Sequence, residues 1–268
     1  MKHIRSFLKW AGGKYNCLNN ILPSLPNSST LIEPFTGSAT IFMNTNYDFN
    51  ILAEANPDLV NIFLQIQENG AEFINYCESF FINSNNDNLK YYQLREKFNN
   101  TTNKSERAAI FLYLNRHGFN GLCRYNSQGI YNVPFGKYLK PYFPKNEMLL
   151  FYKKSKIAKF LHCDYLETFA LAKPGDFIYC DPPYSPIQQK SNFSQYTKNI
   201  FTENDHLNLA KAAKEAASSG IRVIISNHDT DFTREQYKDA EIKYFKVARN
   251  ISRNYYQRKP TNELIAIY

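Results

Sequence analysis

Cysteine is scarce in this sequence, with five residues in 268, an odd number that includes no C-x-x-C pair. Their scatter argues against a disulfide framework and a structural zinc site, and is typical of a reducing cytoplasm. The five histidines have no metal-ligand spacing either, so we expect no metal. No apolar run approaches the roughly 18 residues of a membrane span, and the apolar part of the first ten residues is too short for a signal peptide. We therefore expect a cytoplasmic protein that makes no contact with a membrane.

Acidic side chains are missing from three windows, which lie before Glu33, between Glu106 and Glu147, and between Glu241 and Glu263. The whole chain has a net charge of +8, and Lys and Arg in these windows alternate with Tyr, Phe and Asn. Surfaces of this kind suit phosphates and bases. We expect a nucleic acid as partner; a solvated basic face without a partner is the alternative.

The stretch from Phe177 to Tyr184 changes abruptly from apolar residues to a carboxylate and two prolines. Its first four residues, Phe-Ile-Tyr-Cys, are apolar and predict a buried strand. Pro182 and Pro183 end that strand, because neither can donate a ladder hydrogen bond. Asp181 and Tyr184 are therefore expected at the carboxyl end of a strand, where open α/β sheets bind ligands.

This arrangement suits attack by an exocyclic amino group, which is a poor nucleophile because its lone pair is delocalised into the ring. The Asp181 carboxylate and the Pro182 carbonyl can accept hydrogen bonds from both N–H groups and stabilise the developing positive charge. Tyr184 can stack on the heterocycle, which contributes about 1–3 kcal/mol per base. For these four residues alone, an ordinary proline turn is the alternative.

Two other segments predict a nucleoside ligand. Residues 31–42 are typical of a strand, a tight turn and a helix start, and Gly37 lets a ligand approach the amino end of the helix. Residues 50–57 predict a second strand that ends at Glu54, a carboxylate suited to two ribose hydroxyls. Because the turn lacks a full G-x-G-x-x-G, an adenosyl ligand without phosphates is favoured over a dinucleotide. An α/β unit without a ligand is the alternative.

Strand–helix alternation is interrupted in the middle of the chain. Residues 57–77, 91–98 and 105–117 have helical patterns, the last with Ser105 as its N-cap. A run rich in Gly, Asn and aromatics follows up to Tyr138, with a hairpin turn at 126–129. Such a hairpin can enter a DNA groove, where Arg reads guanine and an aromatic or Asn fills the gap left by an extruded base. A solvated hairpin packed on its own aromatics is the alternative.

Alternation resumes towards the carboxyl end. Strands are predicted at 160–164 and 222–226, and a helix at 202–219, with Thr202 and Asp205 as an approximate capping box. Residues 185–200 are polar and predict a loop over the site. Residues 243–247 and 263–268 predict an antiparallel pair joined by the basic loop 249–259.

Taken together, these segments resemble the Dam family of DNA adenine methyltransferases. The matching segments are Phe7-Leu8-Lys9-Trp10-Ala11-Gly12-Gly13-Lys14, Glu33-Pro34-Phe35-Thr36-Gly37-Ser38-Ala39, Asn115–Tyr138, Asp181-Pro182-Pro183-Tyr184 and Ile225-Ser226-Asn227-His228-Asp229. They span almost the whole chain in the family's order. The resemblance implies transfer of a methyl group from S-adenosylmethionine, without a metal, to the 6-amino group of a flipped adenine in double-stranded DNA, typically within GATC.

The resemblance also implies roles for individual residues. The cofactor-binding residues would be Trp10, Ala11, Gly12, Lys14, Phe35, Gly37, Glu54 and Asp181. The catalytic residues, which hold the adenine, would be Asp181, Pro182 and Tyr184. The DNA-binding residues would be Lys9, Phe119, Asn120, Leu122, Arg124, Pro134, Lys137 and Tyr138. Phe119 and Asn120 sit where the family inserts a side chain into the duplex.

Three residues depart from the family pattern. Ala39 replaces the second turn glycine; this is tolerable if its φ is negative, and we expect binding to survive. Glu54 replaces a commoner Asp and is one methylene longer. Phe119 replaces a commoner Tyr, which keeps stacking but loses a hydroxyl. For Asp181 we expect a normal pKa of about 4, which makes it too weak a base to deprotonate an amine before attack.

The predicted fold is α/β, a Rossmann-like methyltransferase sheet with an inserted, mainly helical DNA-recognition domain that carries a β-hairpin. Residues 1–56 and 160–268 form the catalytic domain in this prediction, and residues 57–159 form the insert. We expect a monomer. From the residues alone, methylation of the 4-amino group of cytosine stays open, because it needs the same acceptors. A non-catalytic DNA-binding regulator on the same fold also stays open.

Overall fold

The computed structural model describes residues 3–184, 201–247 and 261–268. The predicted loops at 185–200 and 249–259 lie outside these residues. The strands are β1 (Thr30–Glu33), β2 (Phe49–Ala53), β3 (Ala158–Leu161), β4 (Phe177–Cys180), β5 (Arg222–His228), β6 (Glu241–Val247) and β7 (Thr261–Ile267). The α-helices are α1 (Leu18–Ile21), α2 (Thr40–Met43), α3 (Pro57–Glu78), α4 (Asn88–Asn100), α5 (Lys104–His117), α6 (Lys145–Ser155), α7 (Tyr165–Phe169), α8 (Glu203–Ser218) and α9 (Asp231–Gln236).

The strands form a seven-stranded sheet with the order β3-β2-β1-β4-β5-β7-β6. Strands β1 to β5 run parallel, and β7 is antiparallel to both β5 and β6. The chain runs outward from β1 through β2 to β3 and then returns to the other side of β1 as β4. The strand order therefore reverses between β1 and β4, where open α/β sheets bind ligands at the carboxyl ends of the strands. The predicted Rossmann-like α/β fold is confirmed.

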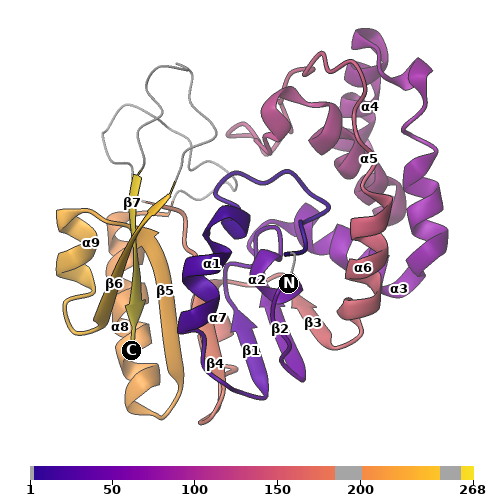
Figure 1. Cartoon of the computed structure of the whole chain (residues 1–268). Coiled ribbons are helices and arrows are strands. Elements are labelled where there is room, and N and C mark those ends of the chain that lie inside the picture. Colours follow the sequence, from indigo (N-terminus) through magenta and orange to yellow (C-terminus); the bar gives the residue numbers. More distant parts are fainter. Residues whose placement is uncertain (1–2, 185–200, 248–260) are drawn as a thin grey trace.

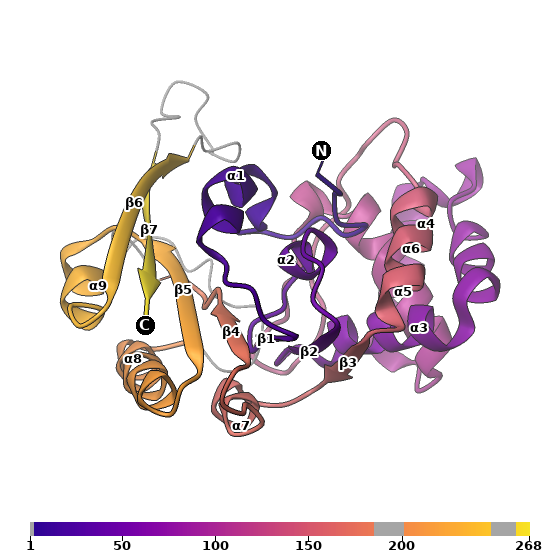
Figure 2. The same cartoon turned by 60° about the horizontal axis from the view of Figure 1, so that its bottom comes forward.

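Helices cover both faces of the sheet, with α1 and α2 on one face and α7 and α8 on the other (Figure 2). Side chains of a strand point alternately to the two faces. Accordingly, Phe177 and Tyr179 of β4 belong to the cluster that includes α1, whereas Ile178 and Cys180 belong to the cluster that includes α8. Burial on both faces explains why β4 is continuously apolar in the sequence.

Helices α3 to α6 lie together beside the β3 edge of the sheet (Figure 1). Three rings join them to that edge: Phe63 of α3 lies 5.0 Å from Phe151 of α6 and 5.3 Å from Phe160 of β3, measured between ring centroids. One buried cluster thus spans the helices and the sheet edge. The division into residues 57–159 and the remainder stays a prediction.

The predicted helices and strands are largely confirmed, and the differences lie mostly at their ends. The strand predicted at 160–164 begins earlier, because Ala158 already pairs with Asn50 of β2. The N-cap predicted at Ser105 is wrong: α5 is capped by Asn103, whose side chain accepts a hydrogen bond from Glu106 N. The capping box of Thr202 and the antiparallel pairing of β6 with β7 are confirmed. Helices α1, α6 and α9 had no counterpart in the predictions.

Candidate active site

The turn after β1 brings two of the matching segments together. Its backbone closes through a hydrogen bond from Ala39 N to Thr36 O of 2.9 Å. Gly37 has a φ of +49°, and a Cβ on it would stand 3.2 Å from the indole nitrogen of Trp10. Glycine is therefore needed at this point, both for the backbone angle and for the approach of Trp10. The condition set for Ala39, a negative φ, is not met: its φ is +56°, in the left-handed region that costs a non-glycine residue about 1 kcal/mol.

Glu54 follows β2, as predicted, but its carboxylate is directed at the backbone. One oxygen accepts a hydrogen bond from Gly37 N and the other from Asn56 N, both of 3.0 Å. Burial raises the pKa of Glu54, while these backbone N–H groups lower it. The carboxylate therefore braces the Gly37 turn against β2.

Lys14 is a buried cation at the centre of the site. Its ammonium lies 2.8 Å from Asp181 Oδ1 and donates a hydrogen bond of 2.7 Å to the Gly12 carbonyl. It also stands 4.5 Å from the centroid of the Tyr184 ring. Residues predicted from two separate motifs, Lys14 in one and Asp181 with Tyr184 in the other, thus meet at the reversal of strand order between β1 and β4.

Asp181 and Tyr184 are held by strands on the β5 side. Ser226 of β5 donates a hydrogen bond of 3.2 Å to Asp181 Oδ1. The Tyr184 hydroxyl donates one of 3.3 Å to Glu263 Oε2 on β7, and the Tyr184 ring meets His228 edge-on at 4.2 Å. Sequence reasoning missed Glu263; the one available signal was a carboxylate directly before the apolar run of a predicted strand.

Burial raises the pKa of Asp181, and Lys14, Ser226 and Tyr184 oppose that rise. The expected normal pKa is therefore wrong in direction, because the sequence does not show how far the carboxylate is withdrawn from water. Burial likewise raises the pKa of Glu263, against the attraction of Lys14. Burial also raises the pKa of Glu33, at the end of β1, to about 8, although its carboxyl accepts a hydrogen bond from Phe42 N.

The other predicted catalytic and cofactor residues lie nearby in the fold. Ala11 and Gly12 form the turn before Lys14, closed by a hydrogen bond from Gly13 N to Trp10 O. Phe35 stacks on Tyr165 at 5.3 Å between centroids. Pro182 is buried directly after Asp181.

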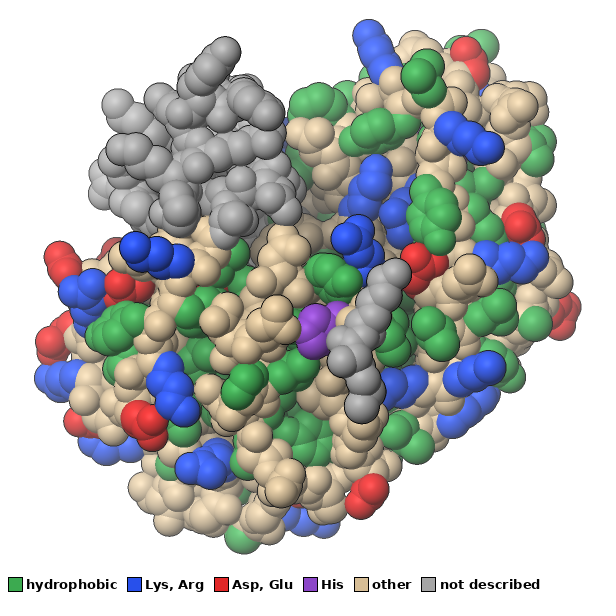
Figure 3. All heavy atoms as spheres, viewed as in Figure 1, with side chains coloured by type: hydrophobic (Ala, Val, Ile, Leu, Met, Phe, Trp, Pro, Cys, Tyr) green, Lys and Arg blue, Asp and Glu red, His purple; other side chains and the backbone are tan. Residues whose placement is uncertain are grey.

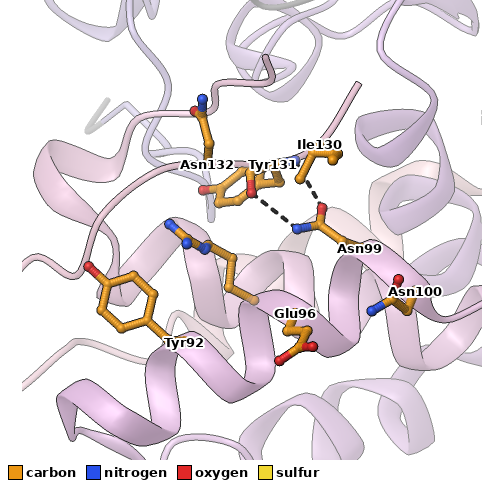
Figure 4. A pocket seen from close by; sticks show the side chains of 8 residues that line it. Tyr92, Glu96, Asn99, Asn100, Ile130, Tyr131 and Asn132 are labelled. Carbon is orange, nitrogen blue, oxygen red and sulfur yellow. Dashed lines mark hydrogen bonds between the residues drawn. The ribbon is translucent and has the colours of Figure 1, made fainter. Parts of the chain in front are cut away.

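The segment from Asn115 to Tyr138 has less regular structure than predicted. The turn at 126–129 is confirmed by a hydrogen bond from Gly129 N to Asn126 O of 2.9 Å. The expected β-hairpin is reduced to two isolated antiparallel bridges, Gly118 with Phe135 and Tyr125 with Tyr131. Side chains of α4 hold the segment from outside, as Asn99 hydrogen-bonds both backbone groups of Tyr131 (Figure 4).

The predicted DNA-binding residues are spread along this segment. Lys9 is brought to Tyr138, with its ammonium 4.1 Å from the ring centroid. Phe119 is 48% exposed, in a 3-10 turn of residues Phe119–Gly121. Arg124 is exposed, and its guanidinium donates to the side chain and carbonyl of Asn132 at 2.7 and 3.2 Å.

The remaining predicted DNA-binding residues differ in exposure. Asn120 and Lys137 are exposed and have φ of +53° and +55°. Pro134 is exposed too, and its carbonyl accepts from Phe119 N. Leu122 is half-buried and packs against the core. Figure 3 shows Lys and Arg side chains gathered in the middle of the face that it draws, next to the part of the molecule formed by helices α3 to α6.

Other classes of site find little support in the described part of the chain. Within it, no group of three or more His, Cys, Asp or Glu side chains could hold a metal ion. All five cysteines are free thiols. None of the helices among the described residues is long and apolar enough to cross a membrane.

Comparison with known proteins gives matches over the full chain. Residues 10–251 match the family model of D12 class N6 adenine-specific DNA methyltransferases. Over its whole length the chain is 45% identical to the DNA adenine methylase of Serratia marcescens and covers 100% of it. It is 47% identical to that of Haemophilus influenzae and 44% identical to that of Escherichia coli K12, covering 94% and 96% of them and matching over 100% of its own length. These matches favour adenine over the cytosine alternative. The chain therefore belongs to the D12 class of N6 adenine-specific DNA methyltransferases.

Proposed function

We propose that the protein transfers a methyl group from S-adenosylmethionine to the 6-amino group of an adenine flipped out of duplex DNA, within the sequence GATC. The observation that carries this proposal is the meeting of Lys14, Asp181 and Tyr184 at the reversal of strand order. An ammonium, a carboxylate and an aromatic ring are the groups that binding a charged cofactor and a flat base requires.

The residues around this cluster suit S-adenosylmethionine, whose sulfonium supplies an electrophilic methyl group when bound. Trp10 and Gly37 come from two different segments and approach each other closely, so both can contact one side of the bound cofactor. The Asp181 carboxylate contacts the Lys14 ammonium, and the Glu263 carboxylate is also attracted by it, which suits a ligand that carries both signs of charge. Glu54 retains acceptor capacity for a ribose hydroxyl, because a carboxylate has about four lone-pair sites.

The same carboxylate can orient the adenine. Lys14 and Ser226 both contact Oδ1 of Asp181, so lone pairs remain for one N–H of the 6-amino group. The Pro182 carbonyl accepts the other N–H, and Tyr184 stacks on the ring. These acceptors stabilise the positive charge that develops on nitrogen. The proton leaves after the N–C bond has formed, because Asp181 remains far too weak a base for a neutral amine.

The segment from Asn115 to Tyr138 would read the DNA. Its exposed Phe119 can occupy the gap left by the flipped base, and Arg124 can contact guanine. The GATC target is proposed from the resemblance of this segment to the Dam family. We further propose that the protein works as a monomer in the cytoplasm, where a reducing environment suits five free thiols.

The test uses purified protein, labelled S-adenosylmethionine and two unmethylated duplexes that differ only in carrying GATC or a scrambled site. Label confined to the GATC duplex and recovered as N6-methyladenine supports the whole proposal. Label in both duplexes contradicts the target sequence but not the reaction. No label in either duplex, with S-adenosylmethionine binding intact, points to another target sequence or to a non-catalytic DNA-binding regulator on the same fold.

A further inference from the structure

Asn115, near the end of α5, has three hydrogen bonds, two to the distant residue Lys9 and one to the nearby turn that contains Gly121. Its side chain is buried, and its Oδ1 accepts from Lys9 N at 2.9 Å. Its Nδ2 donates to the Lys9 carbonyl at 2.7 Å and to the Gly121 carbonyl at 3.3 Å. One amide therefore satisfies both backbone groups of Lys9 and ties them to the turn Phe119–Gly121.

The side chain of Lys9 lies against the same turn. A Cβ on Gly121 would stand 2.5 Å from the Lys9 side chain, so the lysine stem passes directly over this glycine. The Lys9 ammonium is 3.4 Å from the Arg116 carbonyl and 4.1 Å from the Tyr138 ring centroid. The ammonium is thus held near a cationic group and an aromatic ring. Its burial and the nearby Arg116 lower the pKa of Lys9.

The residue after Asn115 supports the same attachment. Arg116 donates from Nη2 to the Phe7 carbonyl at 2.5 Å. Two consecutive residues at the end of α5 thus hold the backbone of residues 7–9, directly before Trp10 and the turn that leads to Lys14. The end of α5 is therefore the physical link between the DNA-reading turn and the catalytic cluster.

We propose that Asn115 is a positioning residue for target recognition, which fixes the backbone of Lys9 so that the lysine and the Phe119–Gly121 turn meet the DNA as one unit. The inference rests on the proposed function, because it takes Lys9 as a base-reading residue. Asn115 is buried and acts only through Lys9 and the turn. Its replacement should therefore reproduce the specificity change of a Lys9 variant.

The test measures kcat/KM for GATC and for duplexes with one base pair of the target changed, with wild type, Lys9→Ala, Asn115→Asp and the double variant. Asn115→Asp keeps the acceptor for Lys9 N and removes both donated bonds. We expect it to lower discrimination about tenfold at the base pair where Lys9→Ala lowers it. The double variant should discriminate there no worse than Lys9→Ala alone, and the dissociation constant of S-adenosylmethionine should change less than twofold.

Asn99 provides a matched control. Its amide accepts from Tyr131 N and donates to the Tyr131 carbonyl, at 2.9 and 3.2 Å, which is the same pair of bonds that Asn115 makes with Lys9 (Figure 4). Asn99→Asp should leave discrimination at the Lys9-dependent base pair unchanged, although it removes an equivalent bond and lowers the Tm.

Gly121→Ala disturbs the contact between Lys9 and the turn from the side of the turn. It replaces Asn115→Asp in the test if that variant does not fold. Its methyl group would push the Lys9 stem directly, so it should give the specificity profile of Lys9→Ala. Gly175→Ala is its control, because Gly175 has a φ of +92° with nothing near its Cβ position. That variant should lower the Tm without altering the profile.

Two outcomes overturn the inference. One is an equal loss of kcat/KM by Asn115→Asp for every duplex, which indicates a structural role only. The other is a double variant whose losses of discrimination multiply, which means that Asn115 does not act through Lys9. Failure of the proposed function is distinguishable, because wild type would then show no methylation or no preference for GATC.

Discussion

The cluster around Lys14 and Asp181, to which we assign the chemistry, and the segment Asn115–Tyr138, which we propose reads the DNA, are built in different ways. Asp181, Ser226 and Glu263 stand on or directly after β4, β5 and β7, so a hydrogen-bonded sheet sets their spacing. The segment from Asn115 to Tyr138 has two isolated bridges instead. It is held by side chains of the helices: Tyr91, Arg95 and Asn99 of α4 bind its backbone, and Asn115 of α5 binds the backbone of Lys9.

Because of this difference, the two regions should respond differently to substitutions. A substitution in the catalytic cluster changes charge and hydrogen bonding while the backbone ladder keeps its register. A substitution at a helix side chain that holds the reading segment can move backbone locally, because no strand ladder holds it there. Chemistry should thus be lost by removing functional groups, and specificity at a given base pair by removing the residue that reads it or the side chain that supports that residue.

The largest expected effect is on turnover. Asp181→Ala removes the acceptor of the adenine amino group and the partner of Lys14, so we expect kcat to fall by about a thousandfold or more, with DNA affinity changed only a few-fold. Single-turnover methylation and fluorescence anisotropy with a labelled duplex measure the two quantities. Asp239→Ala, at an exposed ion pair with Lys214, is the control. Substantial residual methylation would remove Asp181 from its assigned role.

The second expected effect is on stability, and the two regions should respond to pH with opposite sign. Burial raises the pKa of Glu33 from 4.5 to about 8, so the folded state holds a proton that the unfolded state has lost. Stability therefore decreases as pH rises from 4.5 to 8, by about 5 kcal/mol at most. Near the reading segment, burial lowers the pKa of His117 from 6.5 to about 4. Stability there decreases as pH falls from 6.5 to 4, by about 3 kcal/mol at most.

Urea unfolding across this pH range measures the contributions of Glu33 and His117 to the free energy of unfolding. Glu33→Gln should flatten the alkaline side of the stability profile, and His117→Phe, which keeps an aromatic ring against Tyr113, should flatten the acidic side. A profile unchanged by Glu33→Gln would mean that Glu33 is already ionised in the folded state.

The third expected effect is on base preference. Arg124→Ala should relax discrimination at one base pair by about 1–3 kcal/mol while the rate on GATC falls less. Kinetics on duplexes with single base-pair changes measure this. An equal loss across all sequences, with a weaker salt dependence of binding, would instead identify Arg124 as a phosphate contact.

The smallest expected effect is a shift of the acidic limb of the pH profile of kcat. Activity should decrease as pH falls through the pKa of Asp181, because the protonated carboxyl accepts hydrogen bonds poorly. Ser226→Ala removes a donor that lowers this pKa, so the limb should move to higher pH by less than about one unit. Tyr179→Phe removes another partner of the Ser226 hydroxyl and is the control. A limb that moves equally in Arg124→Ala would not belong to Asp181.

The sequence by itself predicted most elements of the fold and most of the residues that meet in the candidate site. Apolar runs ended by Pro182 and Pro183, and a turn with glycine at 37, are local patterns, because strand propensity and backbone angles depend on near neighbours. The motifs around Trp10, Asp181 and Asn115 also indicated the family, which the comparisons then confirmed.

Only the tertiary structure decided how these segments meet. Glu263 contacts Tyr184 from 79 residues away, and Asn115 contacts Lys9 from 106 residues away. Such contacts depend on strand order and helix placement, which no local period encodes. The raised pKa of Asp181 and the positive φ of Ala39 follow from the same cause, because burial and backbone strain are set by surrounding segments that the sequence does not place.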